Sequence, residues 1–247
     1  MVRFDNMLSY FIDYSMLNAN ECHIILSTLD VRVCPYCNRQ YITLYKKNNK
    51  KISTADLDHF FPQSRFKLLS LNLYNMVPSC QICNSRMKLE KAVEIHYPYS
   101  EKLSYGAEFQ LVIKSGMRNL YDMIYGVENS IHLNDFNIEI KATGDDKYKK
   151  MEGTLELFHL RDVYQSHKNY VAELIRTKSR YDNDNSLYIL QKQTESRLES
   201  ILSHRDNLYT LTNDERNRML YKIQGEKDEI PNTPLMKLTT DILKQLS

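Results

Sequence analysis

The fold is decided by the stretch from residue 34 to residue 88, in which three pieces stand out: Cys34-Pro35-Tyr36-Cys37, Asp58-His59 and Cys80-Gln81-Ile82-Cys83-Asn84. Two residues separate the cysteines of each pair, and this gap lets a tight turn direct both thiolates at one ion. Two such pairs complete a tetrahedral set of sulfur ligands. The spacing therefore predicts a structural Zn²⁺ site with these ligands: Cys34, Cys37, Cys80 and Cys83.

Composition and charge limit the classes of protein that the chain can belong to. Its 247 residues carry 33 Lys plus Arg and 31 Asp plus Glu, a formal net charge of +2. This near balance excludes the strongly basic surface of a nucleic-acid coat protein, so any phosphate-binding surface must be local. Four of the five cysteines lie in metal-ligand spacing, which is typical of a reducing compartment. No apolar run resembles a signal peptide or a membrane span. We expect a cytoplasmic protein without a membrane partner.

The regions outside the cysteine pairs are mostly helical in pattern. Apolar residues recur at helical spacing over residues 4–17 and 20–29, which predicts two helices that pack on the core. Cys22 and His23 lie in the second helix and could ligate a metal, but they stand alone at helical spacing, which favours packing. Four regions result: 1–33, N-terminal helices; 34–91, the motif with the cysteine pairs; 92–150, a small β extension; 151–247, a C-terminal helical region.

Within residues 34–91 the residue types predict strand, strand and helix. Residues 40–45 and 52–59 are rich in β-formers and are interpreted as the two strands of a hairpin. The hairpin tip, residues 46–51, holds four lysines that could contact phosphates or simply be solvated. A helix is expected from Gln81 to Lys91, beginning at the second cysteine pair.

The Asp-His pair suits hydrolysis of a phosphodiester. Such a reaction needs a base for the attacking water and a cation for the charge on the leaving oxygen. His59 suits the first task, because an imidazole titrates near neutral pH. Asp58 and the amide oxygen of Asn84 are hard ligands of the kind that Mg²⁺ prefers. Neighbours on a strand point to opposite faces, so Asp58 and His59 share one site only where the backbone twists or bulges.

The order Cys-x-x-Cys, Asp-His, Asn and Cys-x-x-Cys-Asn resembles the HNH, or ββα-metal, endonucleases in their four-cysteine form. The resemblance implies an α+β fold in which a zinc-stapled ββα-metal motif is embedded in a mostly helical chain. It implies His59 as the general base and Asn75 as the residue that orients it. It also implies Asp58 and Asn84 as ligands of a catalytic Mg²⁺ or Mn²⁺. Many members have His in place of Asn84, and the amide favours Mg²⁺ or Mn²⁺ over softer metals.

Contacts to the nucleic acid are expected from three basic residues of the same stretch. Lys88 matches a basic position that is frequent in the family and is expected to contact phosphate. Arg65 and Lys67 lie in the loop or short helix that follows Pro62. The substrate that the resemblance implies is nucleic acid, either DNA or tRNA. The alternative is a non-catalytic zinc-binding module that binds nucleic acid or protein.

The chain beyond the motif predicts first strands and then helices. Strands are expected at residues 111–113 and 131–142. Apolar residues recur at helical spacing from Leu160 to Ile175, and His167 lies on that stripe, where a core histidine is the favoured interpretation. His159 remains undecided. Further helices are predicted in three segments: residues 187–202, 214–223 and 235–246.

The helical tail adds a second resemblance. The run from Phe158 to His167, Phe-His-Leu-Arg-Asp-Val-Tyr-x-x-His, is similar to that of HNH proteins of bacterial anti-phage systems of the Septu and retron types. That resemblance implies an ATPase partner protein and a role in antiviral defence. A restriction-type or mobile-element nuclease is the alternative within nucleases. The tail is expected to dock the partner, or else to complete the core and contact nucleic acid.

Overall fold

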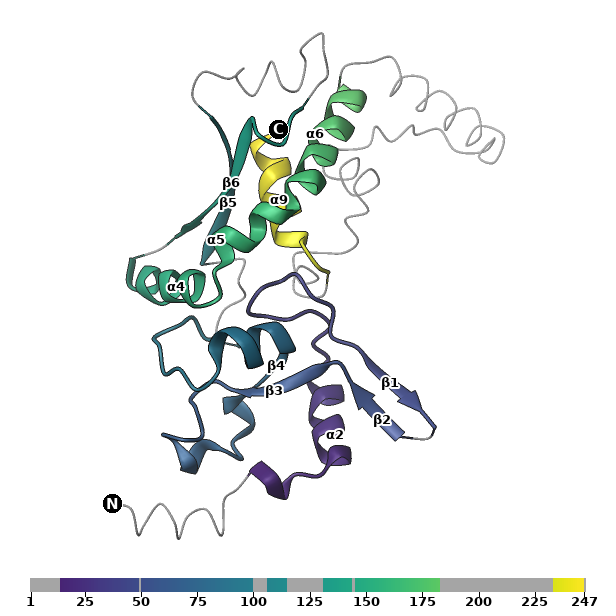
Figure 1. Ribbon diagram of the computed structural model, residues 1–247, viewed down its shortest axis with the longest axis vertical. Helices are drawn as coiled ribbons and strands as arrows, with labels where there is room; N and C mark the ends of the chain where they lie inside the picture. Colours follow the sequence, from purple (N-terminus) through teal and green to yellow (C-terminus); the bar gives the residue numbers. More distant parts are fainter. Residues whose placement is uncertain are drawn as a thin grey trace, which may run out of the picture. The chain divides into compact units, whose positions relative to one another are not determined.

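The computed structural model describes residues 14–48, 50–99, 106–114, 131–143, 145–182 and 233–246 (Figure 1). In these residues helices accompany three two-stranded sheets, so the fold is of mixed α+β type. The chain divides into two compact units. Unit 1 comprises Met1–Phe109, Ile140–Val163 and Glu226–Leu238; unit 2 comprises Gln110–Glu139, Tyr164–Gly225 and Thr239–Ser247.

Unit 1 begins, in its described part, with a short helix and a longer one. The 3-10 helix η1 spans Tyr14–Met16, and α2 spans Ala19–Leu29. Asn18 caps α2, because its side chain accepts from the backbone N–H groups of Asn20 and Glu21, while the Glu21 carboxylate accepts from the backbone N–H of Asn18. The helix predicted at residues 20–29 is therefore confirmed. Most of the helix predicted at residues 4–17 lies outside the described residues.

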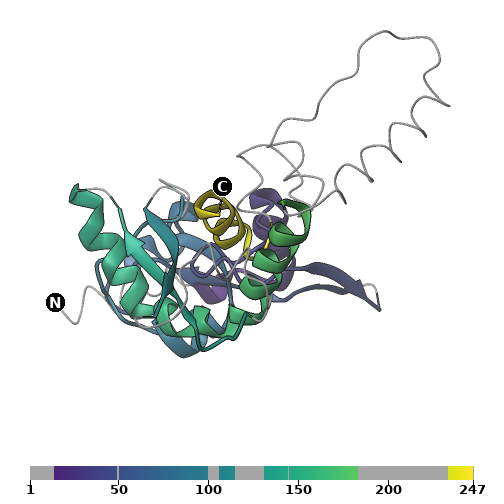
Figure 2. The same ribbon diagram turned by 90° about the horizontal axis from the view of Figure 1, so that it is seen from above.

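The lysine-rich hairpin exists but is shorter than predicted. Strand β1 (Leu44–Lys47) pairs antiparallel with β2 (Lys50–Ser53), and Figure 2 shows this hairpin projecting from the rest of unit 1. The single strand predicted over residues 52–59 is wrong, because β3 (Ala55–His59) follows as a separate strand. The backbone N–H of Ala55 donates to Ser53 Oγ at 2.8 Å, and this side-chain contact marks the change of sheet.

Strand β3 pairs with a strand that the sequence pattern did not predict. This is β4 (Met76–Cys80), antiparallel to β3, with Asp58 opposite Val77 and His59 opposite Met76. Every residue of β4 is buried, so this strand lacks the alternation of buried and exposed residues by which a strand is usually predicted. The 3-10 helices η2 (Lys67–Leu69) and η3 (Leu73–Asn75) lie in the connection between the two strands.

A helix follows β4, as predicted, but it is short and of π type. It is η4 (Ile82–Lys88), and it ends three residues earlier than the predicted helix. The backbone N–H of Leu89 donates to the carbonyl of Asn84, a five-residue step that is characteristic of a π-helix. Leu89 then leaves the helix with a positive φ of 53°.

The remaining described part of unit 1 is built around α4 (Asp145–Leu157) and α5 (Leu160–Val163). Gly153 lets α4 approach the segment at residues 94–96, because a Cβ there would lie 2.2 Å from the carbonyl oxygen of Glu94. Thr154, one residue on, accepts a hydrogen bond from the backbone N–H of His96 at 2.8 Å. The buried ring of Phe158 stacks on Tyr36, with centroids 4.7 Å apart. These contacts join residues far apart in sequence into one core.

Strands β5 (Ala107–Ile113) and β6 (Phe136–Ala142) form the third sheet. Buried and more exposed residues alternate along both strands, as in a sheet with one face on a core. The strands predicted at residues 111–113 and 131–142 are confirmed with different bounds: the first starts earlier, the second later.

Unit 2 packs helices on this sheet through paired side-chain contacts. The helices in the described part of this unit are η6 (Tyr164–His167), α6 (Lys168–Asp182) and the part of α9 (Met236–Gln245) from Thr239 onward. Gln165 binds both backbone groups of Ile138, and Gln245 binds both backbone groups of Leu111. Helices α6 and α9 lie side by side (Figure 1), where Tyr170 and Thr239 share a 2.6 Å hydrogen bond.

The structure tests only some of the predictions for the C-terminal region. The helix predicted at residues 235–246 is confirmed by α9, whereas those at 187–202 and 214–223 lie outside the described residues. His167 is half-buried, with its ring 5.5 Å from that of Tyr164. His159 is exposed in the turn between α4 and α5 and has a φ of 46°. In the part of the chain that the structure describes, no helix has the length and apolar character needed to span a membrane.

Candidate functional site

The two cysteine pairs are brought to one point of unit 1 by different local structures. Cys34 and Cys37 lie in a turn closed by hydrogen bonds from Asn38 N to Cys34 O at 2.8 Å and from Cys34 N to Gln40 O at 2.9 Å. Cys80 is the last residue of β4 and Cys83 lies in the first turn of η4. A turn and a strand-to-helix junction therefore each present one pair.

The four sulfur atoms fit a tetrahedral metal site. All four residues are buried, none forms a disulfide, and their Sγ atoms lie within 4.8 Å of one another. A tetrahedron with Zn–S distances of about 2.3 Å has sulfur atoms about 3.8 Å apart, so little movement is needed. Burial raises the pKa of the Cys34 thiol, and hydrogen bonds from the other thiols lower that of Cys80. The four cysteines predicted as zinc ligands are therefore the ones that the structure brings together, in positions suited to hold one metal ion.

Cys22, the fifth cysteine, is not part of this cluster. It lies on α2, half-buried, with its Sγ atom 3.7 Å from the hydroxyl of Tyr14. Its neighbour His23 is also half-buried. The separation of Cys22 from the four-cysteine cluster agrees with the interpretation of the isolated Cys22-His23 pair as part of a packing helix.

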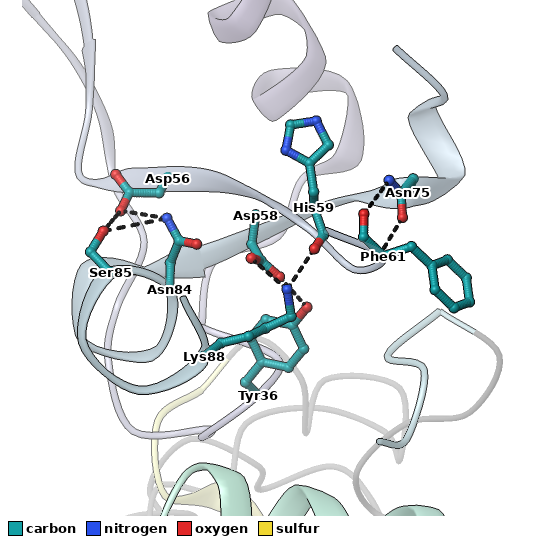
Figure 3. Close-up of polar contacts among 9 residues, drawn as sticks. All are labelled: Tyr36, Asp56, Asp58, His59, Phe61, Asn75, Asn84, Ser85 and Lys88. Atoms are coloured by element: carbon teal, nitrogen blue, oxygen red, sulfur yellow. Dashed lines mark hydrogen bonds and ion pairs between the residues drawn. The ribbon is translucent and has the colours of Figure 1, made fainter. Parts of the chain in front are cut away.

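The polar residues of β3 and η4 meet as two steps of a ladder (Figure 3). Asp56 and Asp58 are two apart on a strand and so share one face, while Asn84 and Lys88 are four apart on a helix and share one side. The side chain of Asn84 contacts Asp56, and that of Lys88 contacts Asp58. We call this group of four side chains on one face of β3, formed by Asp56, Asp58, Asn84 and Lys88, the ladder face.

Asp58 is a buried and fully partnered carboxylate. Its Oδ1 atom lies 2.9 Å from Lys88 Nζ, and its Oδ2 atom accepts a 2.6 Å hydrogen bond from the hydroxyl of Tyr36. Burial and the nearby Asp58 carboxylate keep the pKa of Tyr36 well above its ordinary value, so the hydroxyl stays protonated and donates. The Asp58 and Lys88 side chains are only 3% and 1% exposed. Lys88, expected to contact phosphate, is thus part of a buried ion pair.

Asp56, which sequence reasoning missed, is the carboxylate that contacts Asn84. Its Oδ2 atom accepts from Asn84 Nδ2 at 3.1 Å and from Ser85 Oγ at 3.2 Å. In the structure the amide of Asn84 thus donates to Asp56, while Asp58 is bound by Lys88 and Tyr36. The signal was present in the sequence, because Asp56 precedes Asp58 by two residues and a strand places such residues on one face.

His59 lies on the opposite face of β3 from the ladder face (Figure 3). The β3–β4 register is regular through His59, so no bulge turns its ring toward Asp58. Nε2 lies 2.8 Å from the carbonyl oxygen of Ser70, and the ring of Tyr14 packs edge-on against the imidazole at 4.9 Å. Since a carbonyl only accepts, Nε2 carries the proton and Nδ1 of a neutral imidazole is left as an acceptor.

Asn75 fixes the loop that holds His59 in place. Its side chain is buried; Oδ1 accepts from Phe61 N at 2.7 Å, and Nδ2 donates to Phe61 O and Leu69 O, both at 3.1 Å. These bonds tie the start of the β3–β4 connection to the segment beside Ser70, the partner of His59. On the same connection, Arg65 is exposed and Lys67 is half-buried.

A cavity of about 580 Å³ opens beside the ladder face. Residues from both faces of β3 line it, Asp56 from the ladder face and Leu57 from the face of His59. Tyr14, whose ring touches His59, is also part of the wall. Further polar lining residues come from three elements: His23 of α2, Lys51 and Ser53 of β2, and Asn84 and Ser85 of η4.

Comparisons with known proteins add no relative to this description. Neither the protein-family models, nor the curated proteins, nor the solved structures gave a match to the chain. The molecule is therefore characterised by its own geometry: an α+β fold, a buried four-cysteine site that fits a structural zinc, and a polar ladder face beside a cavity.

Proposed function

We propose that the chain is a metal-dependent endonuclease of the HNH type, which hydrolyses phosphodiester bonds of DNA or tRNA. The observation that carries the proposal is the fixed geometry of His59, whose Nε2 is held by the Ser70 carbonyl at 2.8 Å. A histidine held in this way keeps Nδ1 available to accept a proton from a water molecule. Arg65 and Lys67, on the same connection, are proposed to contact the substrate backbone.

The four-cysteine site supports the proposal by its position. A zinc ion bound there would fasten the end of β4 and the first turn of η4 to the turn at residues 34–38. The antiparallel pair β3–β4 followed by η4 gives the order strand, strand, helix that the resemblance implies. In this proposal the zinc holds the framework and takes no part in the reaction.

The catalytic step assigns a separate task to each face of β3. His59 accepts a proton from the attacking water at Nδ1, while Nε2 keeps its own proton and donates it in the hydrogen bond to the Ser70 carbonyl. Asn75 holds the loop that carries this carbonyl and is a positioning residue. A Mg²⁺ or Mn²⁺ ion bound at the ladder face would stabilise the negative charge on the leaving oxygen. The resemblance assigns that ion to Asp58 and Asn84.

Cleavage assays with the His59 variants test the proposal. The zinc-loaded chain is incubated with Mg²⁺ or Mn²⁺ and with duplex DNA, single-stranded DNA and tRNA. Removal of a general base costs about 10²- to 10⁴-fold in rate, so both His59→Ala and His59→Gln should lose cleavage to that extent. The exposed His132 provides the matched control, His132→Ala, which should cleave like the wild type. Cleavage at the wild-type rate by either His59 variant would refute the base.

The non-catalytic zinc module remains the second candidate because the Asp58 carboxylate is already bound by Lys88 and Tyr36. The same assay separates the two candidates. A wild-type chain that binds the nucleic acids but cleaves none of them with either metal ion would establish the module. Zinc content and the thermal unfolding curve are measured in parallel, so that a misfolded preparation is not counted as an inactive one.

A role in anti-phage defence beside an ATPase partner extends the proposal. It rests on the resemblance of the run from Phe158 to His167. In the structure Phe158, Leu160 and Tyr164 of this run are buried, so packing accounts for its apolar positions. Co-expression with an ATPase of the ABC or SMC-like kind, followed by size-exclusion chromatography, tests the partner. Separate elution of the two proteins would remove this extension and leave the nuclease proposal intact.

A further inference from the structure

We infer that Asp56, rather than Asp58, provides the carboxylate that binds the divalent cation beside Asn84, in the cavity lined by β3 and η4. The inference rests on the proposed function and deepens it. It changes the metal-ligand set of the ladder face to Asp56, Asn84 and Ser85. It also places the cation in the cavity of about 580 Å³ that these residues line.

Asp58 is a poor ligand for a second cation because its two oxygens are already used. Oδ1 faces the ammonium of Lys88 at 2.9 Å, and Oδ2 accepts from Tyr36 at 2.6 Å. Lys88 Nζ also donates to the carbonyl oxygen of His59 at 2.5 Å, so it is held by two acceptors. A dication on Asp58 would sit against this buried positive charge, where charges are weakly screened. Binding there would require the Lys88 ammonium to move away from the two oxygen atoms that it contacts in Figure 3, Asp58 Oδ1 and the carbonyl oxygen of His59.

Asp56 has the opposite environment. Its side chain is only half-buried and lines the cavity, and its contacts on η4 are with the neutral side chains of Asn84 and Ser85. It forms no ion pair with any residue that the structure describes. Neutral donors of this kind rearrange at small cost, since an amide can turn its oxygen inward and a hydroxyl can rotate.

The three side chains supply the oxygen atoms that a hard cation requires. A carboxylate, an amide oxygen and a hydroxyl oxygen can take three positions of an octahedron, and water or phosphate oxygens complete it. Mg²⁺ and Mn²⁺ are the cations that suit such a set. The charge also fits, because one carboxylate with two neutral ligands leaves the bound ion positive enough to attract a phosphodiester.

The cavity wall also carries a positive charge. Lys51, an exposed residue of β2, lines the cavity together with Asp56. A lysine at this place attracts an anionic phosphodiester toward the cation that we infer.

Binding of Mn²⁺ to the intact, zinc-loaded chain tests the inference without any need for catalysis. Electron paramagnetic resonance measures free and bound Mn²⁺, and elemental analysis confirms that zinc still fills the cysteine site. The wild type should bind one Mn²⁺ per chain. Asp56→Asn should raise the dissociation constant for Mn²⁺ at least about tenfold, because the loss of even an outer partner of a metal ligand lowers metal affinity about 10- to 100-fold. Asp162→Asn, at an exposed aspartate, is the matched control and should bind like the wild type.

A second variant addresses Asp58 without leaving a buried charge unpaired. The double change Asp58→Asn with Lys88→Met removes both members of the ion pair, and we expect its Mn²⁺ affinity to stay within about threefold of the wild type. Wild-type affinity in Asp56→Asn would overturn the inference, as would loss of Mn²⁺ binding in the double variant alone.

The outcome for the nuclease is read separately. If cleavage depends on His59 while Mn²⁺ binding ignores Asp56, the nuclease stands and this inference is overturned. If Mn²⁺ binding follows Asp56 as expected and no nucleic acid is cleaved, the cation site stands and the proposed activity fails.

Discussion

The four-cysteine cluster and the ladder face lie in the same unit and share the junction between β4 and η4, yet they are assembled in different ways. Each half of the cluster consists of two cysteines separated by two residues, so a local turn is enough to aim both thiolates. The ladder face instead pairs residues 28 and 30 positions apart, Asp56 with Asn84 and Asp58 with Lys88. One site is built mainly from local spacing, and the other from the alignment of a strand with a helix.

This difference decides how readily the members of each site can be recognised. A cysteine in a two-residue pair has few roles in a reducing compartment, and metal binding is the main one. An aspartate on a strand can serve as a ligand, as one member of an ion pair or as a hydrogen-bond acceptor. Which of these it becomes depends on the side chain that faces it. Asp56 and Asp58 are two residues apart and have the same chemistry, but they face a neutral amide and an ammonium group respectively.

The largest effect is expected from breaking the cysteine cluster. Apparent binding free energies of structural zinc are about 10–16 kcal/mol, so Cys80→Ser should lose the ion and unfold at least residues 34–88. Cys22→Ser is the matched control, because Cys22 lies outside the cluster, and it should retain one zinc per chain. Elemental analysis and circular dichroism measure the two effects. Full zinc occupancy in Cys80→Ser would contradict the ligand set.

A smaller but still large effect is expected at the buried ion pair. Removing one partner of such a pair costs about 3–5 kcal/mol, because the other charge is left buried alone. Lys88→Met should therefore lower the free energy of unfolding by about that amount, as measured by denaturant titration of the zinc-loaded chain.

The control for this change is the double variant Asp58→Asn with Lys88→Met. It removes both charges and should recover most of the lost stability, since a buried pair adds little net stability over neutral residues of similar size. A double variant as unstable as Lys88→Met would show that packing of the lysine chain, and not the unpaired carboxylate, carries the effect.

The smallest effect is expected at a partly exposed ion pair. Its contribution to the free energy of unfolding can be compared with that of the buried pair. Arg161 binds Glu152 with two hydrogen bonds, of 2.5 Å and 2.8 Å, and these bonds lower the pKa of Glu152 below its ordinary value of 4.5. Glu152→Gln should cost about 0.5–1 kcal/mol at neutral pH, because solvent screens a partly exposed pair.

The pH dependence of this cost has a definite sign. The lowered pKa means that the folded state favours the ionised carboxylate, so the stabilisation is present above about pH 4.5 and is lost as the pH falls through the lowered pKa. The difference in free energy of unfolding between wild type and Glu152→Gln should shrink toward zero at acid pH. A difference that stays constant from neutral to acid pH would show that the charge of Glu152 is not its source.

Much of the helical framework and the metal cluster could be predicted, whereas the central strand pairing could not. Helices α2 and α9 follow from apolar residues at helical spacing and confirm their predicted positions. The strand predicted over residues 52–59 splits because Ser53 binds the backbone of Ala55 and ends one pairing before the next begins. The partner strand β4 was hidden, because all five of its residues are buried and no alternation marks it.

The sequence by itself determined the residues that can do chemistry: four cysteines at ligand spacing, a histidine that can accept a proton, and carboxylates and amides that suit a hard cation. The tertiary structure alone decided how these residues are partnered. Strand alternation places His59 and Asp58 on opposite faces of β3, and the phase of η4 directs Asn84 to Asp56 and Lys88 to Asp58. The physical reason is that a side chain's chemistry is local, whereas its partner is set by the register of elements that are distant in sequence.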